Sequence, residues 1–206
     1  RALCPLAHSQ NTMGFLPENA KSNVEASGGG YLNPSKIQSG TSVRFRLLVK
    51  EPLCFFECWG EDMLNGGVKP FRFAEEPSPS EIEIEMGDYT RRPGRDGKGL
   101  EPVKFAIAVP VYNYDTAKIE ILQLSQKGLI RELDQISQQE DFADILATDF
   151  TLGREGAGLT TEYSLRPCPQ RTKENATVEA ALKEAVAKGF DITRLLGGGN
   201  PFSAEA

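Results

Sequence analysis

The feature that most constrains the fold is a period of two over residues 42–49, where Val43, Phe45 and Leu47 alternate with arginines. Successive side chains of a β-strand point to opposite faces, so this pattern predicts a half-buried strand with a cationic outer face. Glycine and proline interrupt such stretches throughout the chain, with 20 and 13 occurrences in 206 residues. We therefore expect many short elements and no bundle of long helices.

Further strands are predicted where apolar and β-branched runs are separated by turn-forming residues. Pro70 confines its strand to a sheet edge or a strand start, because proline has no N–H to donate. Residues 113–116 form the turn of a β-hairpin, and two prolines, Pro167 and Pro169, are expected to end the sheet. The predicted strands after the first lie at 53–59, 69–73, 104–112, 117–124, 149–154 and 160–165.

Apolar residues recur at helical spacing over residues 125–137 and again over residues 175–189. Each pattern predicts an amphipathic helix. Ser125 is the expected N-cap of the first helix, because its hydroxyl can accept from a free backbone N–H. Gly189 is expected to end the second helix, because glycine tolerates the left-handed conformation that follows many helices.

Charge is strongly segregated between residues 75 and 104. Residues 75–88 contain six acids, two prolines and no base, and we interpret them as a solvated loop with one short helical turn around residues 80–86. The sign then reverses, because five bases and three glycines fall within residues 91–104. This second stretch is predicted to be a mobile basic loop.

The order of these elements predicts a mainly β, α+β protein. A helix inserted between late strands of a small barrel is a feature of the OB-fold. We therefore expect a partly open OB-fold barrel of five or six strands with an inserted helix and a C-terminal helix, and a β-sandwich is the alternative. The expected domains are a flexible N-terminal extension (1–30), the barrel (31–172) and a C-terminal helix and tail (173–206).

The charge balance excludes a generally polycationic protein, because 23 Lys and Arg against 29 Asp and Glu give a net charge of −6. Any affinity for nucleic acid must then come from a local concentration of bases. No apolar run approaches the ~18 residues that a membrane-spanning helix needs, and no secretory signal pattern opens the chain. We expect a soluble, cytoplasmic protein with reduced cysteines.

Catalysis and metal binding lack a recognisable motif. The single histidine, His8, has no nucleophile motif beside it. Cys54 and Cys58 would lie about 13 Å apart on one strand face, too far to share a tetrahedral zinc ion. The glycine-rich stretch 153–158 lacks the Gly-Lys-Ser ending of a phosphate-binding loop. We expect no enzymatic activity, no metal and no cofactor.

Bases interleaved with aromatic residues are the remaining pattern. Proteins that hold single-stranded nucleic acid combine a cationic groove with aromatic platforms on which bases stack. We predict that the arginines of the first strand and of the loop contact phosphates and that aromatic residues stack on bases; the alternative for these aromatics is the core. The candidate site residues are Arg44, Arg46, Trp59, Lys69, Arg72, Phe73, Arg91, Arg92, Arg95, Lys98, Lys104, Tyr112 and Tyr114.

Several short motifs follow one another between residues 31 and 170. They are Tyr-Leu-Asn-Pro-Ser-Lys-Ile at 31–37 leading to Val-Arg-Phe-Arg-Leu at 43–47, Trp-Gly-Glu at 59–61 before Lys-Pro-Phe-Arg-Phe at 69–73, residues 106–114, residues 121–127, and residues 149–152 followed by 156–163. In this order they resemble the single-stranded DNA-binding replication proteins of tailed bacteriophages and prophages, which have an OB-fold core.

The resemblance implies cooperative, largely sequence-independent coating of single-stranded DNA during replication or recombination, with no chemistry on the substrate. The implied partners are single-stranded DNA, neighbouring copies along it, and replication or recombination proteins that contact the C-terminal tail. No membrane is implied, and the expected location is the host cell cytoplasm if the protein is phage-encoded.

Two features depart from the wider class. Its members commonly end in a strongly acidic tail, whereas here Pro201 and Phe202 have only Glu205 nearby. Some phage relatives also carry a structural zinc, which the cysteine spacing here does not supply. The alternative function is that of a phage structural or adaptor protein whose β-domain contacts other protein chains.

Overall fold

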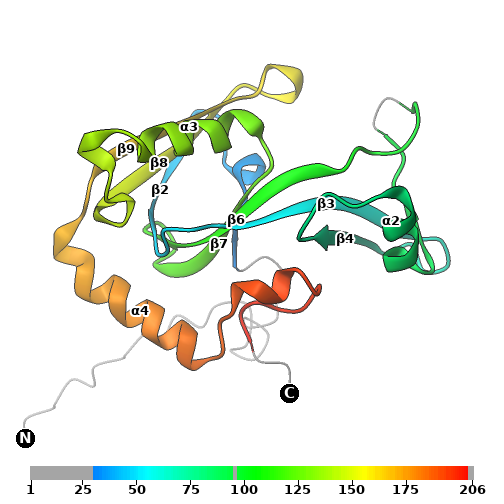
Figure 1. The fold of residues 1–206 in the computed structure, drawn as a ribbon. Coiled ribbons are helices and arrows are strands. Elements are labelled where there is room, and N and C mark those ends of the chain that lie inside the picture. Colours follow the sequence, from blue (N-terminus) through cyan, green and yellow to red (C-terminus); the bar gives the residue numbers. More distant parts are fainter. Residues whose placement is uncertain (1–29, 95–96, 204–206) are drawn as a thin grey trace, which may run out of the picture.

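The structure of this chain is a computed structural model that describes residues 30–94 and 97–203 (Figure 1). A sheet of nine strands carries three α-helices in these two ranges. The strands are β1 (Tyr31–Leu32), β2 (Thr41–Leu47), β3 (Leu53–Asp62), β4 (Val68–Phe73), β5 (Tyr89–Arg91), β6 (Lys104–Asn113), β7 (Lys118–Leu124), β8 (Thr148–Glu155) and β9 (Glu162–Pro169). The helices are α2 (Pro79–Met86), α3 (Lys127–Ser137) and α4 (Asn175–Ala187). The predicted mainly β, α+β class is confirmed.

The sheet is mixed, and its main path runs β1-β7-β6-β2-β8-β9. β1 pairs with β7 in parallel, and the other pairs are antiparallel. β6 is the central strand: β7 pairs along one side of it, while β2 and β3 share the other side. The outer part of β3 then pairs with β4 and β5 and leaves the main path.

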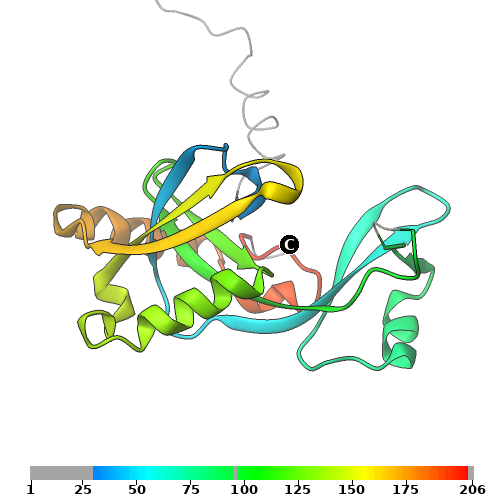
Figure 2. The same cartoon turned by 90° about the horizontal axis from the view of Figure 1, so that it is seen from above.

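The molecule therefore has two parts. We call the outer part of β3 with β4, α2 and β5 the wing, and the remainder the body. Figure 2 shows the wing projecting away from the body, with α2 lying along one side of it. The strand β3 is continuous between them, because it pairs with β6 at one end and with β4 and β5 at the other.

Strand alternation sorts the hydrophobic core into three clusters. The largest lies between the body sheet and α3, where Phe45, Phe150 and Leu133 pack together. The second lies on the opposite face of the sheet, where Phe55 packs under a C-terminal 3₁₀ turn, η6 (Ile192–Leu195). The third fixes α2 on the wing. We call the sheet side that carries α3 and α2 the helix face, and the opposite side the outer face.

The acidic segment 75–88 is the clearest correction to the predicted elements. It is not simply a solvated loop, because α2 occupies Pro79–Met86 and buries Ile82 and Met86 against the wing. Ser78 and Glu81 close a capping box, in which each side chain bonds to the other residue's backbone N–H. The helix therefore forms despite its acidic composition.

Two smaller predictions are also wrong. Ser125 is not the N-cap of α3, which begins after Gln126 without a side-chain cap. Pro167 does not end the last strand but lies within β9, whose last residue is Pro169 as expected. This position is tolerated because β9 is an edge strand that pairs only with β8. Gly189 follows α4 at a φ of 89°, as expected for a helix end.

Candidate nucleic-acid interface

Strand register places most of the predicted site residues on one side of the sheet. Arg46 lies opposite Tyr112 across β2 and β6, on the outer face. Arg72 and Lys104 both lie opposite Glu57, which shares the outer face with Phe55 two residues before it. The predicted residues on this face are Arg44, Arg46, Trp59, Arg72, Arg92, Lys104, Tyr112 and Tyr114.

A buried carboxylate organises the body end of this face. Asp149 on β8 has no exposed surface and accepts a hydrogen bond from Arg46 Nε at 2.9 Å. Arg44 donates to its other oxygen from Nη2 at 3.0 Å, and the backbone N–H of Arg171 donates there at 3.0 Å. The hydroxyl of Tyr114 also donates to Asp149, at 3.0 Å. These contacts compensate the buried charge.

The C-terminal segment covers this cluster. Arg46 donates to the side chain of Asn175 at 2.7 Å and to the carbonyl of Arg171 at 3.2 Å, and it is only 5% exposed. Arg44 also donates to the Pro169 carbonyl, but its side chain keeps 26% of its surface exposed. The expectation that both arginines are open to phosphate is therefore wrong for Arg46, because η5 (Thr172–Glu174) and the start of α4 lie over it.

The two predicted tyrosines differ in accessibility. Tyr112 is 2% exposed and packs edge-on against Tyr114, so it offers no surface for stacking on a base. Tyr114 is half-buried, and three guanidinium groups lie within 6 Å of its ring, with that of Arg171 nearest at 4.8 Å. Burial, followed by its hydrogen bond to Asp149, raises the pKa of the Tyr114 hydroxyl well above its ordinary value.

A polar groove lies beside this cluster on the same face. Arg44, Thr151 and Arg166 stand directly opposite one another across β2, β8 and β9. One register step away, Ser42 and Ser164 flank Gly153, which has no side chain to fill the space between them. The resulting hollow has a volume of about 330 Å³. We call it the sheet groove; its lining includes Ser42, Thr151, Gly153, Ser164 and Arg166.

Arg72 has a structural environment. Its Nε donates to Glu57 at 3.0 Å, and both side chains are about nine-tenths buried. Its other nitrogens donate to the side chain of Gln123 and to the carbonyl of Leu195. Because β3, β7 and η6 each supply one of these acceptors, Arg72 joins the wing to the body and its charge is already matched by Glu57.

The wing end of the outer face holds the single tryptophan. Trp59 is half-buried and lies opposite Pro70 on β4, while its carbonyl accepts from the Arg92 backbone N–H at 2.8 Å. The Arg92 side chain pairs with Glu61 at 3.2 Å, and Lys104 pairs with Glu101 at 2.9 Å. The exposed fractions of these two cationic side chains are near one half, so neither is shielded from solvent.

The remaining predicted residues lie elsewhere. Lys69 is on the helix face of the wing, with its ammonium 4.3 Å from the centre of the Tyr89 ring. Phe73 packs into the cluster beneath α2, so its alternative as a core residue is the correct one. Arg91 donates to the carbonyl of Glu101 at 3.1 Å. Lys98 is exposed in the loop, and Arg95 lies outside the described residues.

Sequence reasoning missed the sheet groove. Arg166 could have been found from its position directly after the buried Leu165, where the strand predicted over residues 160–165 continues in the structure. Nothing in the sequence indicates that Thr151 and Ser164 line a groove with it, since only the pairing of β8 with β9 brings these residues together. Asp149 is recognisable from the sequence as an acid in a predicted strand, but its role depends on residues from three other segments of the chain.

Neither metal centres nor membrane-spanning helices occur among the residues that the structure describes. No three ligand-type side chains come together there in a metal-binding arrangement. None of the helices in ranges 30–94 and 97–203 has the length and apolar character to cross a bilayer. No protein-family model matches the chain, and comparison with curated proteins and with solved structures also finds no match.

Proposed function

We propose that this protein binds single-stranded DNA without sequence preference and coats it during phage replication or recombination. In this proposal the sheet groove contacts the phosphates, and the half-buried aromatic residues of the outer face stack on bases. The protein has no catalytic role in it and acts in the cytoplasm of the host cell. The OB-fold is part of the same proposal, supported by α3 lying between the hairpin β6-β7 and the hairpin β8-β9.

The observation that carries the proposal is the row of Arg44, Thr151 and Arg166 beside the hydroxyls of Ser42 and Ser164. Guanidinium and hydroxyl groups are the side chains that most often contact phosphate oxygens. The groove is formed on the backbone of paired strands, so its donors are held in place before a ligand arrives. An extended anionic chain is the ligand that this arrangement suits.

The accessible aromatic residues favour a single strand over a duplex. Unpaired bases expose faces that can stack on an aromatic ring, and each such contact contributes about 1 to 3 kcal/mol. Tyr114 lies at the body end of the outer face and Trp59 at its wing end. Three arginines surround Tyr114. Two carboxylates, those of Asp149 and Glu174, pair with them, so one positive charge remains in excess there despite the net charge of −6.

The proposal is tested by titrating fluorescently labelled oligo(dT) with the protein at 50 and 300 mM salt, beside a duplex of equal length. We expect Arg166→Glu to weaken binding at least tenfold at 50 mM salt. Removal of a phosphate contact should also reduce the log–log salt slope by about 0.7. Trp59 is the single tryptophan, so quenching of its fluorescence reports contact at the wing.

A matched control carries the same charge change outside the sheet groove. Lys183 on α4 is three-quarters exposed and pairs only with Glu179 of its own helix among the described residues. Lys183→Glu should therefore leave affinity within twofold of the parent protein. Equal losses for the two variants would assign the effect to net charge, and no binding of the parent at 50 mM salt would reject the proposal.

A second candidate function is assembly with other protein chains. It is favoured by the tip of the β3-β4 hairpin, where Met63 and Leu64 are 74% and 89% exposed. Neighbouring apolar side chains at a loop tip are typical of contact surfaces. Stable assemblies in the absence of DNA, together with no affinity for oligo(dT), would support this function over the first.

A further inference from the structure

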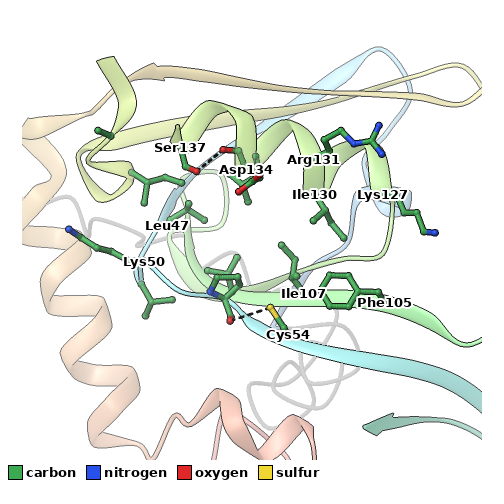
Figure 3. Close-up of a pocket in the computed structure, with 16 residues that line it drawn as sticks. Leu47, Lys50, Cys54, Phe105, Ile107, Lys127, Ile130, Arg131, Asp134 and Ser137 are labelled. Atoms are coloured by element: carbon green, nitrogen blue, oxygen red, sulfur yellow. Dashed lines mark hydrogen bonds between the residues drawn. The ribbon is translucent and has the colours of Figure 1, made fainter. Parts of the chain in front are cut away.

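The helix face of the sheet is incompletely covered. α3 packs over its body end and α2 over its wing end. Between α3 and the sheet lies a cavity of about 690 Å³ whose floor includes Leu47, Ile107 and Val109 (Figure 3). Ile130 projects into it from α3, and the exposed thiol of Cys54 opens on it from β3. The cavity is mostly apolar, yet it is open to solvent.

Around this apolar floor, three basic side chains outnumber one acidic side chain, that of Asp134 on α3. Lys127 and Arg131 project from α3 on one side, and Lys50 lies on the other (Figure 3). Within ranges 30–94 and 97–203, no ion pair engages Lys127 or Arg131, and Lys50 has only a long, exposed contact of 3.8 Å with Asp144. A ligand with an apolar centre and acidic groups on both sides would match this cavity.

The wing of the same chain carries a surface of that description. Ile84 on α2 is 81% exposed, although Ile82 and Met86 on the same helix are buried. Glu83 and Glu85 flank it, each about 100° away around the helix axis. Both glutamates are exposed and make no ion pair among the described residues. α2 therefore presents one apolar side chain between two free carboxylates.

We propose that α2 of a second copy of this chain docks into the cavity. Ile84 fills the apolar centre, while Glu83 and Glu85 face the cations contributed by Lys50, Lys127 and Arg131. The two surfaces are complementary in charge, and the described parts of the chain leave both of them exposed. This inference goes beyond DNA binding, because it joins copies through surfaces on the helix face, opposite the proposed DNA-contacting face.

The size of the contact sets the expected strength. Stable protein interfaces bury about 800 Å² per partner, more than one short helix covers. We therefore expect weak association in dilute solution and a marked increase when two copies are held on one strand of DNA. Disulfide cross-linking is the suitable test, because a cross-linked dimer accumulates even when the contact is occupied only part of the time.

The test pairs two distinguishable proteins in the absence of DNA. The donor carries Cys54→Ser, Cys168→Ser and Ile84→Cys; the acceptor keeps Cys54 and Cys4 but carries Cys168→Ser. On mild oxidation we expect a disulfide between acceptor Cys54 and the thiol introduced at position 84, identified by peptide mass spectrometry. The matched donor has Leu159→Cys in place of Ile84→Cys, because Leu159 is fully exposed in the loop between β8 and β9.

The expected result is disulfide formation at least tenfold faster for the position 84 donor than for the position 159 donor. Reversing the acceptor's charges with Lys127→Glu and Arg131→Glu should slow it at least fivefold. Adding Glu83→Lys and Glu85→Lys to the donor should restore it. Such a reversal and rescue would separate docking from random collision.

Equal rates for the two donors, or no response to charge reversal, would overturn the proposal. A dominant disulfide between Cys4 and Cys54 would also overturn it, because residues 1–29 would then occupy the cavity. The test contains no DNA, so its outcome is independent of whether the chain binds single strands. Circular dichroism of each variant checks that the exposed substitutions leave the fold unchanged.

Discussion

Asp149 determines how the arginines of β2 are used. A carboxylate without exposed surface is costly unless charged and hydrogen-bonding groups compensate it. Three side chains donate hydrogen bonds to it, those of Arg44, Arg46 and Tyr114. The backbone N–H of Arg171 donates a further one. One residue thus holds β2, β6, β8 and the C-terminal segment together.

Removing this charge should destabilise the protein strongly. In Asp149→Asn the guanidinium of Arg46 stays buried without its counter-ion, so we expect the free energy of unfolding to fall by about 3 to 5 kcal/mol. Urea unfolding followed by circular dichroism measures it. Glu179→Gln breaks an exposed ion pair and should change stability by less than about 1 kcal/mol. Similar losses in both variants would contradict the structural role of Asp149.

Tyr114 makes the stability of the folded protein depend on pH in the alkaline range. Its folded-state pKa lies above the ordinary value of 10.0, so the folded state binds its proton more tightly than the unfolded state does. The resulting stabilisation is complete below pH 10 and is lost as the pH rises above it. We expect the parent protein to lose more stability between pH 9 and 11 than Tyr114→Phe, as measured by urea unfolding. If the free energy of unfolding fell equally with pH in the two proteins, Tyr114 would not be the source of this pH dependence.

In α2, two features of the local sequence favour different structures. The pattern Ser-Pro-Ser-Glu at residues 78–81 is a readable capping box with proline in the first turn. The acidic composition of residues 75–88 favours instead a solvated loop, in which the sequence predicts one short helical turn around residues 80–86. What decided the outcome was burial of Ile82 and Met86 against β3 and β4, a tertiary contact that no local pattern reports.

The capping box can be tested by a single substitution. Ser78→Ala removes the hydroxyl that accepts from the Glu81 backbone N–H, and we expect a loss of about 1 kcal/mol. Hydrogen exchange should show faster opening of the Ile82 amide, with little change in β8. Ser39→Ala, in the exposed turn before β2, is the control and should leave both quantities unchanged. A protected Ile82 amide in Ser78→Ala would show that packing alone holds α2.

For the whole molecule, the sequence predicted the strands better than their assembly. The alternation around Phe45 correctly assigned core and outer sides to β2, because that information is local. The covering of Arg46 by Asn175 depends on residues 129 positions apart, and the sheet groove depends on the pairing of β8 with β9. Pairing of distant segments leaves no mark in a single sequence, so the wing and the groove could not be foreseen.

The continuity of β3 has a mechanical consequence. Leu53–Asp62 is a single strand, and β6, β4 or β5 pairs with each of its residues in turn, so it contains no unpaired position that could act as a hinge. The wing is thus expected to move as a rigid unit relative to the body, to which Arg72 connects it by its bond to the Leu195 carbonyl. A displacement of the wing tip is therefore passed on to the body along β3, and to the C-terminal segment through the bond between Arg72 and Leu195.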